Sequence, residues 1–122
     1  MGSPLREQRP WGWFETLGVG SGHLVKRLWI EPHRRLSRQR HQHRCEHWVI
    51  AAGGGLVELD ENELVVAPGS TLTIPVGMVH RASAGAEGLL IVEVQRGQPL
   101  REDDIERLED DYGRVVGSGA SL

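Results

Sequence analysis

The chain comprises 122 residues, of which 39% are hydrophobic and 25% charged, and its formal net charge is −3 at pH 7. This length allows one domain with one core; the net charge and the short apolar runs make neither nucleic acid nor a membrane an expected partner. The single cysteine, Cys45, cannot form an internal disulfide, which suits the reducing cytoplasm where we expect the protein to act.

In chain order, short strand-like segments alternate with turns rich in glycine, proline and asparagine. After a predicted flexible tail at residues 1–8, one domain is expected at residues 9–114. Strands that are this short, without helices between them, predict an all-β sandwich or barrel. The predicted strands are 23–30, 37–43, 46–52, 56–59, 63–66, 71–74 and 89–95.

The sequence changes character after residue 97. Residues 100–112 are acidic, and Ile105, Leu108 and Tyr112 recur at helical spacing. This pattern predicts a short amphipathic C-terminal helix packed against the barrel. Residues 115–122 are expected to form a second flexible tail.

Two clusters of potential metal ligands stand out. His41 and His43 are two residues apart, so on a strand they point to the same face, and Glu46 follows them. A distant Pro-x-Gly-x-x-His segment ends in His80. Imidazoles and a carboxylate are ligands of divalent transition metals. We therefore predict one such ion (Zn, Mn, Co, Ni or Fe) held by His41, His43, Glu46 and His80, a combination that resembles both halves of the cupin signature.

The fourth ligand has an alternative. The cupin pattern places a glutamate seven residues before a glycine that ends a strand. Counting back from Gly53 gives Glu46, whereas counting back from Gly54 gives His47. We favour Glu46, because it places the apolar residues of the same strand on the inward face.

Longer motifs show a closer resemblance. RPWG at residues 9–12, LSRQRHQHRCEHWVI at 36–50, IPVGMVHR at 74–81 and VEVQRG at 92–97 resemble the cupin domain of type II mannose-6-phosphate isomerases. The resemblance extends over residues 9–114. It implies a single cupin double-stranded β-helix, a jelly-roll barrel, and the isomerase half of a family whose larger members also carry a GDP-mannose pyrophosphorylase domain. Nothing in these 122 residues resembles that second domain.

The implied reaction converts mannose 6-phosphate to fructose 6-phosphate through an enediol. It needs a metal or donor at the carbonyl, a group that moves a proton, and a cationic anchor for the phosphate. Arg44 beside the ligands and Arg81 after the last histidine are candidate anchors. Lys26 lies on an otherwise apolar strand face, which is unusual unless it reaches the cavity, so it is a further catalytic candidate.

The proton-transfer group has three candidates: Glu93, His47 and a metal-bound hydroxide. Glu93 and Gln95 share one face of a strand, and a buried carboxylate there would have a raised pKa suited to a base near neutrality. Gln39 shares the face of the predicted histidine pair. Gln39 and Gln95 are therefore expected to contact the substrate.

Other readings stay open. Three histidines and a glutamate can also hold iron or manganese for oxygenation or decarboxylation. The domain could instead bind a sugar phosphate without turning it over. Edge strands favour pairing of subunits, so we expect a homodimer.

Overall fold

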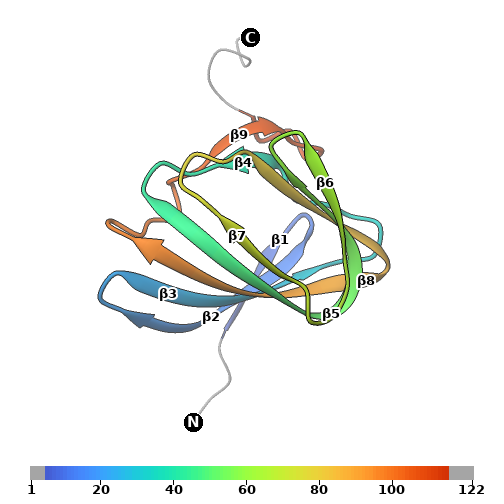
Figure 1. Ribbon diagram of the computed structural model, residues 1–122, viewed down its shortest axis with the longest axis horizontal. Coiled ribbons are helices and arrows are strands. Elements are labelled where there is room, and N and C mark those ends of the chain that lie inside the picture. Colours follow the sequence, from blue (N-terminus) through green and yellow to red (C-terminus); the bar gives the residue numbers. More distant parts are fainter. Residues whose placement is uncertain (1–4, 116–122) are drawn as a thin grey trace.

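The computed structural model describes residues 5–115. Within this range all regular secondary structure is strand, which confirms the all-β prediction, and no helix that could span a bilayer occurs. The sheet curls into a half-barrel (Figure 1). Its strands are β1 (Arg6–Arg9), β2 (Gly12–Gly20), β3 (His23–Ile30), β4 (Arg38–Arg40), β5 (Arg44–Leu59), β6 (Asn62–Val66), β7 (Thr71–Ile74), β8 (His80–Gly97) and β9 (Glu106–Glu109).

Two long antiparallel strands, β5 and β8, organise the sheet. They pair from Arg44 opposite Gly97 to Leu59 opposite His80, while the other edge of β5 pairs with β7 and β6. Irregular register near Gly53 bends β5. Gly53 has φ +76°, and a Cβ there would lie 2.0 Å from the carbonyl oxygen of Gly88, so the bend requires glycine.

Burial alternates along β5, and this alternation positions the site. Glu46, Trp48 and Ile50 are buried on the inner face, whereas Val49 is exposed on the outer one. Polar residues share the inner face with the apolar core, which includes Trp11, Phe14, Leu28, Ile30, Leu36, Trp48, Ile50, Ile74, Leu89 and Ile91. The half-barrel therefore encloses both its core and a set of ionisable side chains.

The predicted C-terminal helix is wrong. Residues 106–109 form β9, which pairs with β4 and places Arg107 opposite Gln39. Three apolar residues at intervals of three and four are too few to distinguish a helix from an extended segment, and here the open edge of β4 supplies a hydrogen-bonding partner. Ion pairs hold the acidic stretch in place, among them Arg40–Glu106 at 2.7 Å and Arg35–Asp111 at 2.7 Å.

The folded domain also begins earlier than predicted. Residues 6–8, which we assigned to a flexible tail, belong to β1 and pair with β2. Arg6 and Arg27 both bind the buried carboxylate of Glu15, at 3.0 and 2.5 Å, and so tie β1 and β3 to β2. Of the two predicted tails, residues 1–4 and 116–122 lie outside the described residues.

Candidate metal centre

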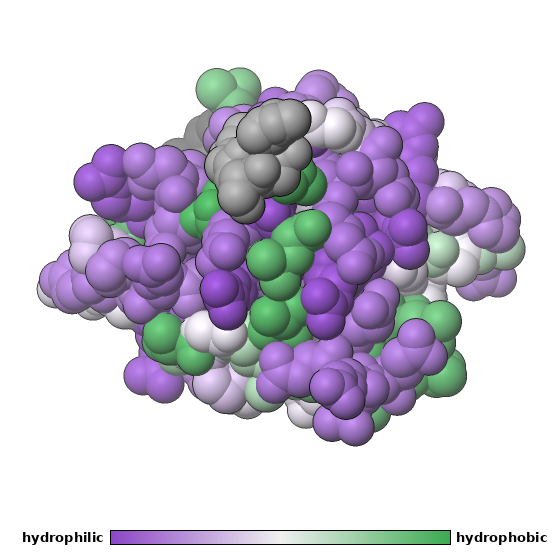
Figure 2. Space-filling view, turned by 90° about the horizontal axis from the view of Figure 1, so that it is seen from above, coloured by the Kyte–Doolittle hydropathy of each residue, from purple (hydrophilic) through white to green (hydrophobic). Residues whose placement is uncertain are grey.

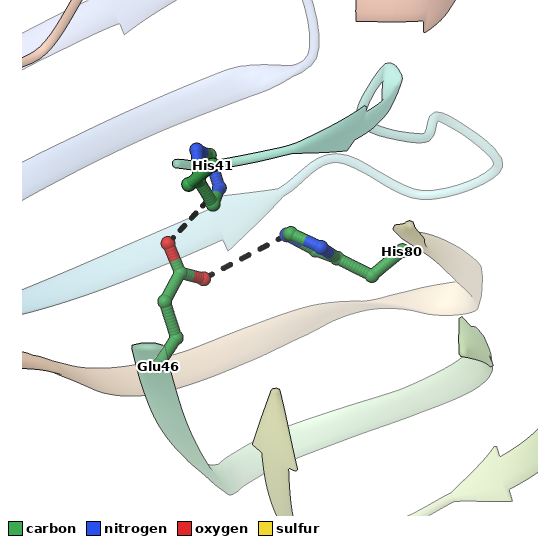
Figure 3. A group of neighbouring side chains, drawn as sticks. All are labelled: His41, Glu46 and His80. Atoms are coloured by element: carbon green, nitrogen blue, oxygen red, sulfur yellow. Dashed lines mark ion pairs between the residues drawn. The ribbon is translucent and has the colours of Figure 1, made fainter. Parts of the chain in front are cut away.

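Three side chains from separate parts of the chain converge on one buried point (Figure 3). His41 follows β4, Glu46 lies in β5 and His80 begins β8; they are 3%, 1% and 1% exposed. The Nε2 atoms of His41 and His80 lie 3.2 and 3.8 Å from the two carboxylate oxygens of Glu46. All three ligand atoms lie within 4.8 Å of one another.

Backbone carbonyls orient both imidazole rings. His41 Nδ1 lies 2.7 Å from the carbonyl oxygen of Asp104, and His80 Nδ1 lies 3.0 Å from that of Met78. A carbonyl can only accept, so each Nδ1 carries the hydrogen and each Nε2 faces Glu46. Metal-binding histidines are commonly held in this way.

The surroundings of Glu46 keep it ionised although it is buried. Burial would raise the pKa of Glu46, but the neighbouring side chains of His41, His80 and Arg44 hold that pKa well below its usual range. Burial lowers the pKa of His80. Arg44 Nε donates to Glu46 at 2.8 Å, and its Nη2 lies 3.3 Å from His41 Nε2. Two imidazoles and a carboxylate therefore fit a divalent transition metal, with coordination positions left for a substrate.

His43 does not join this cluster. β4 ends at Arg40, so the alternation on which the four-ligand prediction depended stops there, and His43 is exposed. The carboxylate of Asp104 accepts the backbone N–H groups of Gln42 and His43 at 2.8 and 2.9 Å. The turn that these bonds stabilise brings in His41 and leaves the side chain of His43 on the surface.

The structure distinguishes Glu46 from His47. Since β5 is a regular strand at this point, only Glu46 points inward. His47 lies on the outer face, where Arg96 Nε donates to its Nε2 at 3.0 Å and Thr73 Oγ1 lies 3.4 Å from its Nδ1. His47 is therefore neither a ligand nor a proton-transfer group of this site.

A cavity of about 150 Å³ adjoins the three-residue cluster. Glu46 and His80 line it, so a metal held there would face the cavity. Five other residues that the sequence pattern singled out line the same space, namely Lys26, Gln39, Arg44, Glu93 and Gln95.

Glu93 is a second buried carboxyl group in this cavity, and its pKa is shifted in the direction opposite to that of Glu46. Burial, together with the neighbouring negative charge of Glu46, raises the pKa of Glu93 to about 8. Trp48 Nε1 donates to both carboxylates, at 3.1 Å to Glu46 and 3.0 Å to Glu93, and Gln95 donates to Glu93 at 2.8 Å. A carboxyl group held in this way can give or accept a proton near neutral pH. The polar role of Trp48 was missed in the sequence, although its place two residues after Glu46 was a usable signal.

Lys26 is 4% exposed and reaches the cavity from β3. Its ammonium lies 4.1 Å from the centre of the Phe14 ring and forms an ion pair with Glu102. The Lys26 side chain is thereby held in place between an aromatic ring and a carboxylate.

Arg81 does not reach the cavity. It follows His80 in β8 and points to the other face, where Nε donates to the carbonyl of Leu36 at 2.9 Å and Nη2 donates to that of Glu109 at 3.1 Å. It therefore joins β8 to the segments beside it. Three arginines that the sequence pattern did not single out line the cavity instead: Arg9, Arg107 and Arg114.

Comparison with known proteins gives the family context. The family described as "Mannose-6-phosphate isomerase C-terminal" matches residues 5–110. The alginate biosynthesis protein AlgA of Pseudomonas aeruginosa is 44% identical over 109 residues, which are 88% of this chain and 23% of that protein. A mannose-1-phosphate guanylyltransferase of Escherichia coli is 39% identical over 108 residues, with the same shares of 88% and 23%. The chain thus spans about a quarter of the length of these relatives.

Solved structures agree on the fold. A RmlC-like cupin from Shewanella frigidimarina superposes with a TM-score of 0.72 at 18% identity, over 82% of this chain and 87% of that one. At this identity the likeness concerns the fold alone, and it identifies the half-barrel as a cupin.

Proposed function

This chain belongs to the mannose-6-phosphate isomerase C-terminal family, and we propose that it is a metal-dependent isomerase that converts mannose 6-phosphate to fructose 6-phosphate. The observation that carries the proposal is the shared cavity of a buried two-histidine, one-carboxylate cluster and a proton-exchanging carboxyl group, Glu93. Aldose–ketose isomerisation requires these two functions side by side.

The reaction moves a proton between the two carbons at the carbonyl end of the sugar, through an enediol. A divalent metal held by His41, Glu46 and His80 would supply Lewis acidity toward the oxygens on those carbons. Glu93 is the proposed proton-transfer group, since its raised pKa matches the task and Gln95 and Trp48 fix its orientation.

Cationic residues have a separate role in the proposal. Lys26 would donate to the oxygen that becomes negatively charged as the proton leaves carbon, because its ammonium is buried and already held in position. Arg44 contacts Glu46 and His41 and would steady these ligands as well as contact the sugar. Gln39 offers an amide to the hydroxyl groups of the sugar.

A coupled assay for fructose 6-phosphate tests the proposal. The chain would be stripped of metal, reloaded separately with Zn, Mn, Co, Ni or Fe, and supplied with mannose 6-phosphate. We expect turnover with at least one metal and its loss in His80→Ala. His43→Ala is the matched control, since it removes an exposed imidazole and should leave turnover within about twofold. A folded, metal-loaded chain without turnover would overturn the isomerase assignment.

A second candidate function has some support in the donor set. Two histidines and one carboxylate also hold iron in oxygenases. The cavity carries five cationic side chains, Arg9, Lys26, Arg44, Arg107 and Arg114, against the three carboxylates Glu46, Glu93 and Glu102, which favours an anionic, phosphorylated ligand. Consumption of dioxygen with iron alone would select the oxygenase. Binding of sugar phosphate without turnover would identify a non-catalytic module.

We also propose that the domain forms homodimers in the cytoplasm. Leu56 and Val65 are neighbours across the β5–β6 pair and are 41% and 83% exposed, so that face could bury apolar surface against a second copy. The face seen in Figure 2 is instead mostly hydrophilic, with small separate hydrophobic patches. Light scattering of Val65→Glu beside the unmodified chain tests the dimer, which should dissociate in the variant.

A further inference from the structure

We infer that Arg9, Arg107 and Arg114 form an anion site that binds the phosphate group of a phosphorylated sugar. The identity of the ligand rests on the proposed function, whereas the site itself rests on the geometry of three arginines that line one cavity. Arg9 comes from β1, Arg107 from β9, and Arg114 from the segment that follows β9. Guanidinium groups are suited to phosphate because their planar forks can bind two oxygens at once.

Arg107 is the central residue of this site. Its Nε is buried without a hydrogen-bond partner among residues 5–115. A buried donor without a partner destabilises the fold, and such atoms in native proteins call for an explanation. An anion in the cavity would supply the missing acceptor.

The surroundings of Arg107 are crowded with positive charge. Burial lowers its pKa, and the nearby charges of Arg114 and Arg9 lower it further, while Asp110 acts in the opposite direction. Asp110 is already engaged by Arg114 through two hydrogen bonds, at 2.8 and 2.9 Å. Arg9 donates to the carbonyl oxygen of Gln8 at 2.8 Å, and the carboxylate nearest to it is that of the exposed Glu7, at 3.6 Å. These three guanidinium groups thus have near them only the engaged Asp110 and the exposed Glu7 among the carboxylates named here, and a phosphate would balance their charge.

The register of the sheet places this site at a useful distance from the metal centre. His80 in β8 is opposite Gln39 in β4, and Gln39 is in turn opposite Arg107 in β9. Residues directly opposite each other point to the same face, so the three side chains form one row. Two strand spacings separate the backbones of its ends by about 10 Å. A hexose 6-phosphate carries its reacting carbons and its phosphate at opposite ends, which matches this row.

Calorimetry on the metal-free chain tests the site directly, with inorganic phosphate, mannose 6-phosphate and unphosphorylated mannose as probes. We expect Arg107→Met to weaken the binding of both phosphate compounds at least tenfold. Arg40→Met is the matched control, because Arg40 belongs to the same β4–β9 pair but its side chain is half exposed and bound to Glu106. The control should change affinity less than twofold, and mannose should show no dependence on Arg107.

A second variant covers the case in which Arg107→Met does not fold. Arg9→Gln alters a half-buried residue of the edge strand β1 and should weaken phosphate binding at least threefold. Unchanged phosphate affinity in the folded variants, or equal weakening in Arg40→Met, would overturn the inference.

Isomerase turnover is measured in a separate assay. Phosphate binding that depends on Arg107, without any turnover, would keep the anion site and refute the isomerase. If Arg107→Met turns over mannose 6-phosphate with an unchanged KM, the isomerase assignment stands and the anion site is refuted.

Discussion

The metal end and the arginine end of the cavity differ in how their charges are satisfied. At the metal end, Glu46 contacts His41, His80, Arg44 and Trp48, so its buried charge is compensated within the fold. At the arginine end, Arg107 has a buried donor without a partner among the described residues. The first end is thus assembled before any substrate arrives, whereas the second is completed by its ligand. Substitutions at the two ends should therefore have opposite effects on stability.

The largest effect is expected for Glu46→Ala. It removes a ligand and leaves Arg44 buried without its carboxylate, which should cost about 3 to 5 kcal/mol of unfolding free energy and abolish metal binding. Urea unfolding and metal analysis of the dialysed protein measure the two losses. Glu63→Ala, on the exposed side of β6, is the control and should cost less than about 0.5 kcal/mol. Equal effects of the two substitutions would contradict the view that the metal end is preassembled.

Glu93→Gln should slow turnover about 10²- to 10⁴-fold, because it removes the proposed proton-transfer group while keeping a side chain of nearly the same shape. Metal content should not change. The measurement is kcat under saturating mannose 6-phosphate. A variant with full activity would assign proton transfer to another group.

The effect of Glu93→Gln on stability should depend on pH. Because the folded-state pKa of Glu93 is raised from 4.5 to about 8, the folded chain keeps a proton that the unfolded chain has released between these values. Glu93 therefore destabilises the fold increasingly as pH rises through this window. In metal-free protein, the melting temperature of Glu93→Gln relative to the unmodified chain should increase from pH 5 to pH 8 by at least about 4 °C. A constant difference would show that Glu93 has an ordinary pKa.

Arg107→Met tests the other end of the cavity. Removing a buried, unpartnered donor should leave the unfolding free energy unchanged or raise it by about 1 kcal/mol, in contrast to Glu46→Ala. Thermal melts without phosphate measure this difference. If phosphate is then added, the unmodified chain should gain stability and the variant should not. A loss of several kcal/mol without ligand would show that Arg107 supports the fold itself.

The smallest effects are expected at the two histidines outside the cavity. His43→Ala and His47→Ala should each change stability by less than about 0.5 kcal/mol and turnover by less than twofold. His80→Ala, measured beside them, supplies the contrast of a buried ligand. Loss of metal in His43→Ala would show that the segment at residues 41–43 closes onto the ion when metal binds.

Much of the cavity could be predicted, because it lies on long regular strands. Side chains alternate along residues 44–50 of β5 and 89–95 of β8, so the inward positions of Glu46, Glu93 and Gln95 follow from the sequence once one buried neighbour is known. The burial of Lys26 could also be predicted, because this charged residue lies on an otherwise apolar strand face. His43 was wrongly predicted as a ligand because the segment that carries it is a turn, where strand alternation does not apply.

By itself the sequence determined the all-β class, the cupin family and which residues of β5 and β8 share a face, since these depend on local alternation and on motifs that span only a few residues; the structure decided which of the two faces points inward. Tertiary structure alone decided which histidines meet and that the C-terminal segment is a strand. It also decided that Arg9, Arg107 and Arg114 share one cavity. These outcomes depend on partners distant in the chain, such as Asp104 beside His41 and β4 beside β9. A local pattern carries no information about such contacts, because the free energy that selects them is gained only when the segments meet.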